Sequence, residues 1–188
     1  MIWTAKKREF FRTILVSAQD LPWPNWIAYH DEIKLPGAED FRSKTSGLAR
    51  LPGFQISGIR YFRSVDSPYW SWVQIVRFRT IKQAEFYVDW KLLSSVRMNP
   101  SANLLGSYAL KVDPVFPHSK SIGLRRSFDT PDGPAIEKLL SFSLGHFVVF
   151  TQLAHVENSE PASDDLIRIG AIQATRIAEL ASKFLGGT

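Results

Sequence analysis

The stretch Ile14-Leu15-Val16-Ser17-Ala18-Gln19-Asp20-Leu21-Pro22-Trp23-Pro24-Asn25-Trp26 marks where a helical pattern gives way to a turn rich in proline and tryptophan. Each proline disfavours helical backbone at the residue before it, so a helix predicted over 4–17 must end near Asp20. The two tryptophans then place large apolar surfaces on a segment that has no regular pattern of its own. We therefore expect this segment to fasten an N-terminal helix to a β-sheet.

The composition indicates one globular domain over residues 1–188. Hydrophobic residues make up 45% and charged residues 22% of the chain, which is close to the globular average. The net charge of +5 is spread along the chain, and its longest basic run is Lys6-Lys7-Arg8, so a concentrated nucleic-acid-binding patch is not expected. The absence of cysteine excludes disulfides, thiolate metal sites and cysteine nucleophiles.

Strand and helix signals follow one another along the rest of the chain. Residues 23–53 are punctuated by proline and glycine and are predicted to be irregular. A hairpin is predicted over 54–65 and 69–79, and Thr80-Ile81-Lys82-Gln83 has the form of a capping box that opens a helix to about residue 96. The later predicted elements are strands at 108–112 and 121–128, a strand pair or one long strand at 139–156, and a helix at 163–185. Antiparallel strands flanked by helices predict an α+β fold.

Several short motifs, spread over most of the chain, resemble those of a family of secreted lipoproteins and extracytoplasmic sensor-like domains from bacteria, mostly actinobacteria. The N-terminal helix of that family runs into Ser/Thr-Ala-x-Asp-Leu-Pro-x-Gly-Trp, which Ser17-Ala18, Asp20-Leu21-Pro22 and Trp26 match here. Strand 73–80, which leads into Ala84, and strand 144–149 are also similar to family segments. The match departs at Pro24-Asn25, which replaces the glycine, and this chain has no lipobox cysteine.

The resemblance implies a fold and a kind of function. The fold is an α/β/α sandwich with a central, mostly antiparallel sheet on which the N-terminal and C-terminal helices pack, like that of the extrinsic oxygen-evolving protein of photosystem II. The function is that of a non-enzymatic binding, sensing or assembly module, secreted or in the cell envelope, with a cytoplasmic location as the alternative. Membrane association is expected only through a lipid anchor on a removed leader, since 6–12 is too charged for the apolar part of a signal peptide.

Aromatic residues supply the candidate binding site. Ligand pockets are commonly apolar and aromatic with a few polar groups, so we expect a small apolar ligand or a protein partner to meet such residues. Trp23, Trp26 and Tyr29 either line the mouth of a pocket or only staple the first helix to the sheet, and stapling is the favoured of these alternatives. The predicted ligand-binding residues are Trp23, Trp26, Tyr29, Trp70 and Trp72.

A second hypothesis is a module that binds single-stranded nucleic acid. Basic residues alternate with aromatic residues in the predicted hairpin, as in base-stacking platforms; the arginines are Arg60, Arg63, Arg77 and Arg79. Strand alternation favours a different arrangement, because it places Trp70 and Trp72 away from Arg77. Nucleic acid is therefore the alternative partner rather than the expected one.

No motif indicates catalysis, a cofactor or a metal. Phosphate-binding glycine loops and a nucleophile-elbow sequence are absent from the sequence, so a triad of Ser141, His146 and Asp113 has no support. His146 is expected on a strand, facing the core. The run His30-Asp31-Glu32 is interpreted as a solvated loop, because adjacent extended residues point in different directions and rarely converge on one metal.

Overall fold

The computed structural model describes residues 2–21, 24–36, 51–97, 104–110, 120–131, 133–156 and 160–185. Its elements, in chain order, are α1 (Ile2–Ile14), the short 3-10 helix η1 (Ala18–Asp20), β1 (Trp26–Lys34), β2 (Phe54–Ser64), β3 (Tyr69–Phe78), α2 (Ile81–Arg97), β4 (Leu104–Leu110), β5 (Ser121–Thr130), β6 (Gly133–Leu144), β7 (Phe147–Val156) and α3 (Ser163–Leu185).

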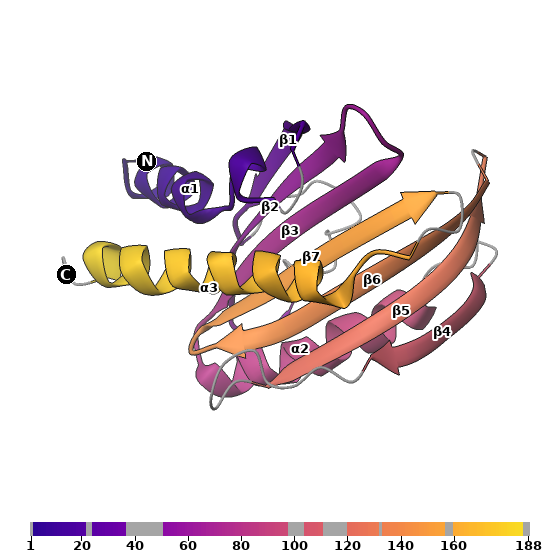
Figure 1. Ribbon diagram of the computed structural model, residues 1–188. Coiled ribbons are helices and arrows are strands. Elements are labelled where there is room, and N and C mark those ends of the chain that lie inside the picture. Colours follow the sequence, from indigo (N-terminus) through magenta and orange to yellow (C-terminus); the bar gives the residue numbers. More distant parts are fainter. Residues whose placement is uncertain are drawn as a thin grey trace.

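The strands form one seven-stranded sheet in the order β1-β2-β3-β7-β6-β5-β4 (Figure 1). Every neighbouring pair in this order is antiparallel. The strand β7 returns between β3 and β6, so the N-terminal hairpin and the C-terminal strands share one sheet. The α+β prediction with an antiparallel sheet is confirmed.

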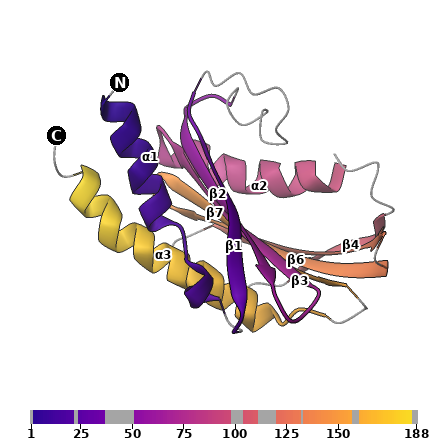
Figure 2. The same ribbon diagram turned by 90° about the horizontal axis from the view of Figure 1, so that it is seen from above.

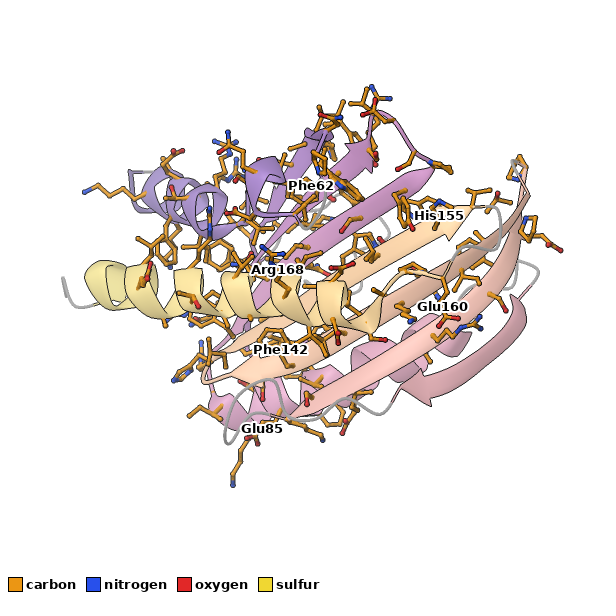
Figure 3. The ribbon with its side chains drawn as sticks, in the orientation of Figure 1. Phe62, Glu85, Phe142, His155, Glu160 and Arg168 are labelled. Carbon is orange, nitrogen blue, oxygen red and sulfur yellow. The ribbon has the colours of Figure 1, made fainter. Side chains whose placement is uncertain are left out.

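Helices cover both faces of the sheet, as the sandwich prediction requires. Figure 2 shows α1 and α3 on one face and α2 on the other. The core beneath α1 and α3 contains Phe62 and Phe142, which are labelled in Figure 3, together with Val73 and Ile75 of β3. A second core beneath α2 is built on Val76 and other residues of alternate parity along the strands.

Two glycines allow α1 and α3 to approach the strands closely. A Cβ atom on Gly58 of β2 would lie 3.1 Å from a ring carbon of Phe11 in α1. A Cβ atom on Gly170 of α3 would lie 3.1 Å from a ring carbon of Phe142 in β6. Both distances are tighter than ordinary van der Waals contact, so a side chain at either position would require the neighbouring side chains to shift by a few tenths of an ångström.

A network of polar side chains holds the turn after α1, where the helix carbonyls would otherwise be buried without partners. Gln173 of α3 donates to the carbonyl oxygen of Ile14 at 2.6 Å and accepts from the amide of Val16 at 3.0 Å. We call this set the turn network; its side chains are those of Ser17, Asp20, Arg60, Gln173 and Arg176.

The charged side chains of the turn network bind residues in and next to the turn after α1. Asp20 accepts hydrogen bonds from the amide and the hydroxyl of Ser17, and from Arg176 at 2.6 Å. Arg60 of β2 donates to the carbonyl of Val16 and binds both carboxylate oxygens of Asp31 at 2.6 and 2.7 Å. Through these bonds the segment from Val16 to Asp20 fastens the end of α1 to α3 and β2.

The structure corrects the prediction for residues 23–53. The segment contains the edge strand β1, so His30, Asp31 and Glu32 belong to a strand and not to a loop. They point to different faces: Asp31 meets Arg60, whereas Glu32 forms an ion pair with Lys34 at 3.1 Å. That these residues hold no metal stays a prediction, and residues 37–50 lie outside the described residues.

The prediction for His146 was also wrong. Residues 139–156 form a strand pair, and Gly145 and His146 make the tight turn between β6 and β7, with Gly145 at a φ of 55°. His146 is exposed in that turn instead of facing the core. The helix α1 ends at Ile14, three residues earlier than predicted, because the turn network takes over its final carbonyls.

Other local predictions are confirmed. The hairpin of β2 and β3 and the helix α3 have nearly the predicted bounds. In the capping box, the amide of Gln83 donates to Thr80 Oγ1, and the amide of Thr80 donates to Gln83 Oε1, both at 3.2 Å. The predicted strand at 108–112 corresponds to β4, although residues 111 and 112 lie outside the described residues.

Candidate functional site

The predicted binding residues are divided between the two faces of the sheet. Trp26 is buried in the core beneath α1 and α3, next to residues of the first helix, which supports the stapling alternative for this tryptophan. Tyr29, Trp70 and Trp72 lie on the α2 face of the sheet or at its β1 edge. Trp23 lies outside the described residues.

Three aromatic rings gather where β1 meets β2. The register of β1 shifts between Ala28 and His30, and the extra residue at this bulge is Tyr29. The rings of Tyr29 and His30 lie 6.1 and 5.6 Å from the ring of Tyr61. Burial, with smaller contributions from Glu32 and Tyr29, raises the pKa of Tyr61, so its hydroxyl remains a neutral donor at neutral pH.

Beside these aromatic residues, a row of buried polar side chains crosses the α2 face diagonally. Each member is a direct or diagonal neighbour of the next across the strands β2, β3, β7, β6 and β5. Most of these side chains are almost fully buried, although the row sits among apolar residues. We call it the polar strip; it consists of Ser57, Gln74, Gln152, Glu137 and Arg126.

An ion pair anchors one end of the polar strip. Arg126 binds the carboxylate of Glu137 through its Nε and Nη2 atoms, and its guanidinium lies 6.0 Å from the ring of Phe128. Burial raises the pKa of Glu137, and the charge and hydrogen bonds of Arg126, with a weaker contribution from Gln152, oppose that rise. At the other end, Gln74 Nε2 donates to Ser57 Oγ at 2.9 Å.

The two tryptophans of β3 reach across β7 above the middle of the polar strip. Trp72 is the direct neighbour of Gln152, yet it packs against the cluster of Leu124 and Leu139 on β5 and β6. Trp70 lies 6.5 Å from the ring of Phe128 on β5, in an edge-to-face contact. The strands between these two rings carry small side chains: Ala154 of β7 is the neighbour of Trp70, and Ala135 of β6 is the neighbour of Phe128.

Two of the buried polar side chains on this face lack full hydrogen bonding among the described residues. The hydroxyl of Ser141, which is completely buried on β6, has no hydrogen-bond partner. The amide nitrogen and oxygen of Gln152 reach no partner at strict hydrogen-bond geometry, although the side chain interacts with Glu137 and helps to oppose the rise in the pKa of that carboxyl. Such groups are uncommon in folded proteins, because each costs about 1–3 kcal/mol when it is buried unpaired.

Among the described residues, the members of the unsupported triad are not brought together. Ser141 is buried within β6 while His146 is exposed in the turn that follows, and Asp113 lies outside the described residues. In the part of the chain that the structure describes, no three histidine or acidic residues gather as metal ligands would.

The arginines of the nucleic-acid hypothesis do not form one platform with the tryptophans. Arg60 lies on the α1 and α3 face and belongs to the turn network. Arg77 lies on that face too, half-buried, with its guanidinium 5.9 Å from the ring of Phe147. Of the hairpin arginines, Arg63 of β2 is the direct neighbour of Trp70.

Sequence reasoning found the tryptophans on β3 but missed the polar strip. Gln152, Glu137 and Arg126 are far apart in the sequence from Gln74 and Ser57, and only the strand register brings them together. The available signal was the presence of charged and amide side chains within the apolar strands β6 and β7.

Among the helices of the described residues, none is both long enough and apolar enough to cross a membrane.

Comparisons with known proteins identify a shared fold, but they assign the chain to no family. No protein-family model matches the chain, and no curated protein matches it. An uncharacterized protein from Mycobacterium smegmatis aligns over 84% of this chain and 90% of its own, with 10% identity and a TM-score of 0.44. The extracellular domain of PknH from Mycobacterium tuberculosis aligns over 93% of this chain and 96% of its own, with 10% identity and a TM-score of 0.58. The chain thus shares the overall fold of that extracellular domain.

Proposed function

We propose that this chain is a non-enzymatic extracytoplasmic module that binds a small, largely apolar ligand on the α2 face of its sheet. The observation that carries the proposal is the pair of half-buried tryptophans, Trp70 and Trp72, above buried polar groups. Binding sites for small molecules combine aromatic walls with a few placed polar groups, and this face offers both.

The location outside the cytoplasm is supported by fold and composition. The chain folds like the extracellular domain of PknH, and a chain without cysteine tolerates an oxidising compartment without mispaired disulfides. A protein partner is the alternative occupant of the same face. It would meet the exposed ring of Tyr29 at the β1 edge before it reached the tryptophans.

Fluorescence titration with N-phenylnaphthylamine, an uncharged apolar fluorophore, tests the ligand proposal. We expect saturable binding with energy transfer from tryptophan to the probe. Trp72→Phe should weaken binding about tenfold, which corresponds to about 1.4 kcal/mol. The matched control is Trp26→Phe, the same change in the core of the opposite face, which should leave the affinity unchanged in the folded protein.

Two results would count against the proposal. Non-saturable binding by the folded chain would mean that this face receives no small apolar molecule. If Trp72→Phe and Trp26→Phe weakened binding equally, the affinity for the probe would depend on the stability of the fold and not on contacts at the proposed site. Circular dichroism of each variant establishes that it is folded under the titration conditions.

A further inference from the structure

Ser141 and Gln152 are neighbours on the α2 face, and in the part of the chain that the structure describes their side-chain polar atoms reach no partner at hydrogen-bond geometry. Ser141 pairs with Phe150 across β6 and β7, and Gln152 lies two residues beyond Phe150, so the two side chains are diagonal neighbours on one face. Diagonal positions in an antiparallel pair lie roughly 7–8 Å apart. A single group that carries a donor and an acceptor on atoms bonded to the same carbon can therefore meet both side chains.

Both side chains carry uncharged hydrogen-bonding groups. The Gln152 amide offers one acceptor and two donors, and the Ser141 hydroxyl both donates and accepts. The only charges of the polar strip, those of Arg126 and Glu137, are paired with each other. An ionised ligand group placed here would lose its water without gaining an opposite charge, which is unfavourable.

The surroundings of the two side chains are apolar. Gln152 lies between Trp72 and Leu139, and Ser141 lies between Phe150 and Ile122, as direct neighbours across the strands. Apolar contacts on both sides exclude water, so a hydrogen bond formed here discriminates strongly between ligands that have the matching group and ligands that lack it.

We propose that the ligand of this face carries an uncharged hydrogen-bonding group of the amide kind, which Gln152 and Ser141 bind while its apolar body meets Trp72. The inference rests on the proposed function and specifies its ligand class. The bound ligand would supply hydrogen-bond partners to the Ser141 hydroxyl and the Gln152 amide, which reach none at hydrogen-bond geometry among the described residues.

Three compounds with the same aromatic body test the inference on the full chain: naphthalene carboxamide, methylnaphthalene and naphthoate. Calorimetric or fluorescence titration should show the carboxamide binding about tenfold more tightly than methylnaphthalene, since two buried groups gain partners. Naphthoate should bind more weakly than the carboxamide. Ser141→Ala and Gln152→Met should each reduce the preference for the carboxamide and leave the affinity for methylnaphthalene unchanged.

Thr151→Val is the matched control. The Thr151 hydroxyl is equally buried and also lacks a partner among the described residues, but it lies on the α3 face. This change should leave the preference for the carboxamide intact. Ser141→Ala should not lower the melting temperature of the ligand-free chain, because it removes an unpaired buried group; a fall would show that the hydroxyl has a structural partner and would contradict the inference.

The outcomes separate the inference from the proposed function. If all three compounds bind equally, or naphthoate binds best, the inference is wrong while the proposed function stands. If the preference for the carboxamide persists in both variants, these residues do not bind the group, and they hold ordered water only. If none of the compounds binds, the proposed function fails and the inference fails with it.

Discussion

The turn network and the polar strip are two groups of buried polar side chains on opposite faces of one sheet, and they differ in how completely their atoms are paired. In the turn network, Gln173 uses both its amide nitrogen and its amide oxygen on the backbone after α1. In the polar strip, the amide of Gln152 reaches no partner at hydrogen-bond geometry among the described residues.

The difference indicates different roles. Complete pairing makes the turn network a structural fastening, since each hydrogen bond is satisfied in the folded chain alone. Incomplete pairing costs stability, so a buried group of this kind calls for a partner from outside the chain, such as ordered water or the proposed ligand. Substitutions in each group should therefore have different effects on stability and on binding.

The largest effect is expected at the ion pair of the polar strip. Arg126→Met leaves Glu137 buried without its cation, and breaking one side of such a pair costs about 3–5 kcal/mol at neutral pH. Because burial already raises the pKa of Glu137, the cost should shrink as the pH falls and the carboxyl becomes protonated in both proteins. Urea unfolding at several pH values measures the change.

The double variant Arg126→Met with Glu137→Leu is the control for that experiment. Replacing both charges by apolar side chains removes the unpaired carboxylate, so most of the lost stability should return. A double variant no more stable than Arg126→Met alone would show that packing, and not the buried charge, accounts for the loss.

The second effect is expected in the turn network. Gln173→Leu leaves the carbonyl of Ile14 and the amide of Val16 buried without this partner, which should lower the free energy of unfolding by about 2–4 kcal/mol. Thr175→Ala, an exposed change on the same helix, should cost far less. Within the folded state, N-phenylnaphthylamine binding should be unaffected by Gln173→Leu. A large loss of affinity would show that the turn network and the binding face are coupled, which contradicts our assignment of separate roles.

A smaller, pH-dependent effect is expected at Asp20. Burial would raise the pKa of this carboxyl, but the hydrogen bonds from Ser17 and the charge of Arg176 outweigh it and lower the pKa below its usual 3.8. Its contribution to stability is therefore present at neutral pH and is lost as the pH falls through the lowered pKa. Asp20→Asn should reduce stability by about 1 kcal/mol near pH 7.

A series of unfolding curves from pH 7 downward tests the Asp20 prediction. The difference between wild type and Asp20→Asn should narrow toward acid pH, where the wild-type carboxyl also becomes neutral. A difference that stays constant over the range would show that the carboxylate charge does not contribute through Ser17 and Arg176.

Local patterns were sufficient to predict most of the fold. The capping box at Thr80 and Gln83 and the alternation along β3 depend on residues close in sequence, and both are found as expected. β1 was missed because it is an edge strand: residues 27–31 are exposed in succession, so no alternation of apolar and polar side chains marks it. That residues 1–188 form one domain stays a prediction.

The candidate site was only partly predictable, for a physical reason. Trp70 and Trp72 could be placed on one face because they are two residues apart on one strand. Trp26 seemed to belong with them by composition, but the path of β1 puts it on the other face. Glu137 and Gln152 come together only through the register of β6 with β7, which a single sequence does not specify.

Fluorine NMR of the chain labelled with fluorotryptophan tests the central claim most directly, because it reports on both faces in one spectrum. Resonances assigned with Trp→Phe variants are followed while N-phenylnaphthylamine is added. We predict that the signals of Trp70 and Trp72 shift to saturation while that of Trp26 stays in place. A shift of Trp26 with Trp70 and Trp72 unchanged would place binding on the α1 and α3 face and contradict the account.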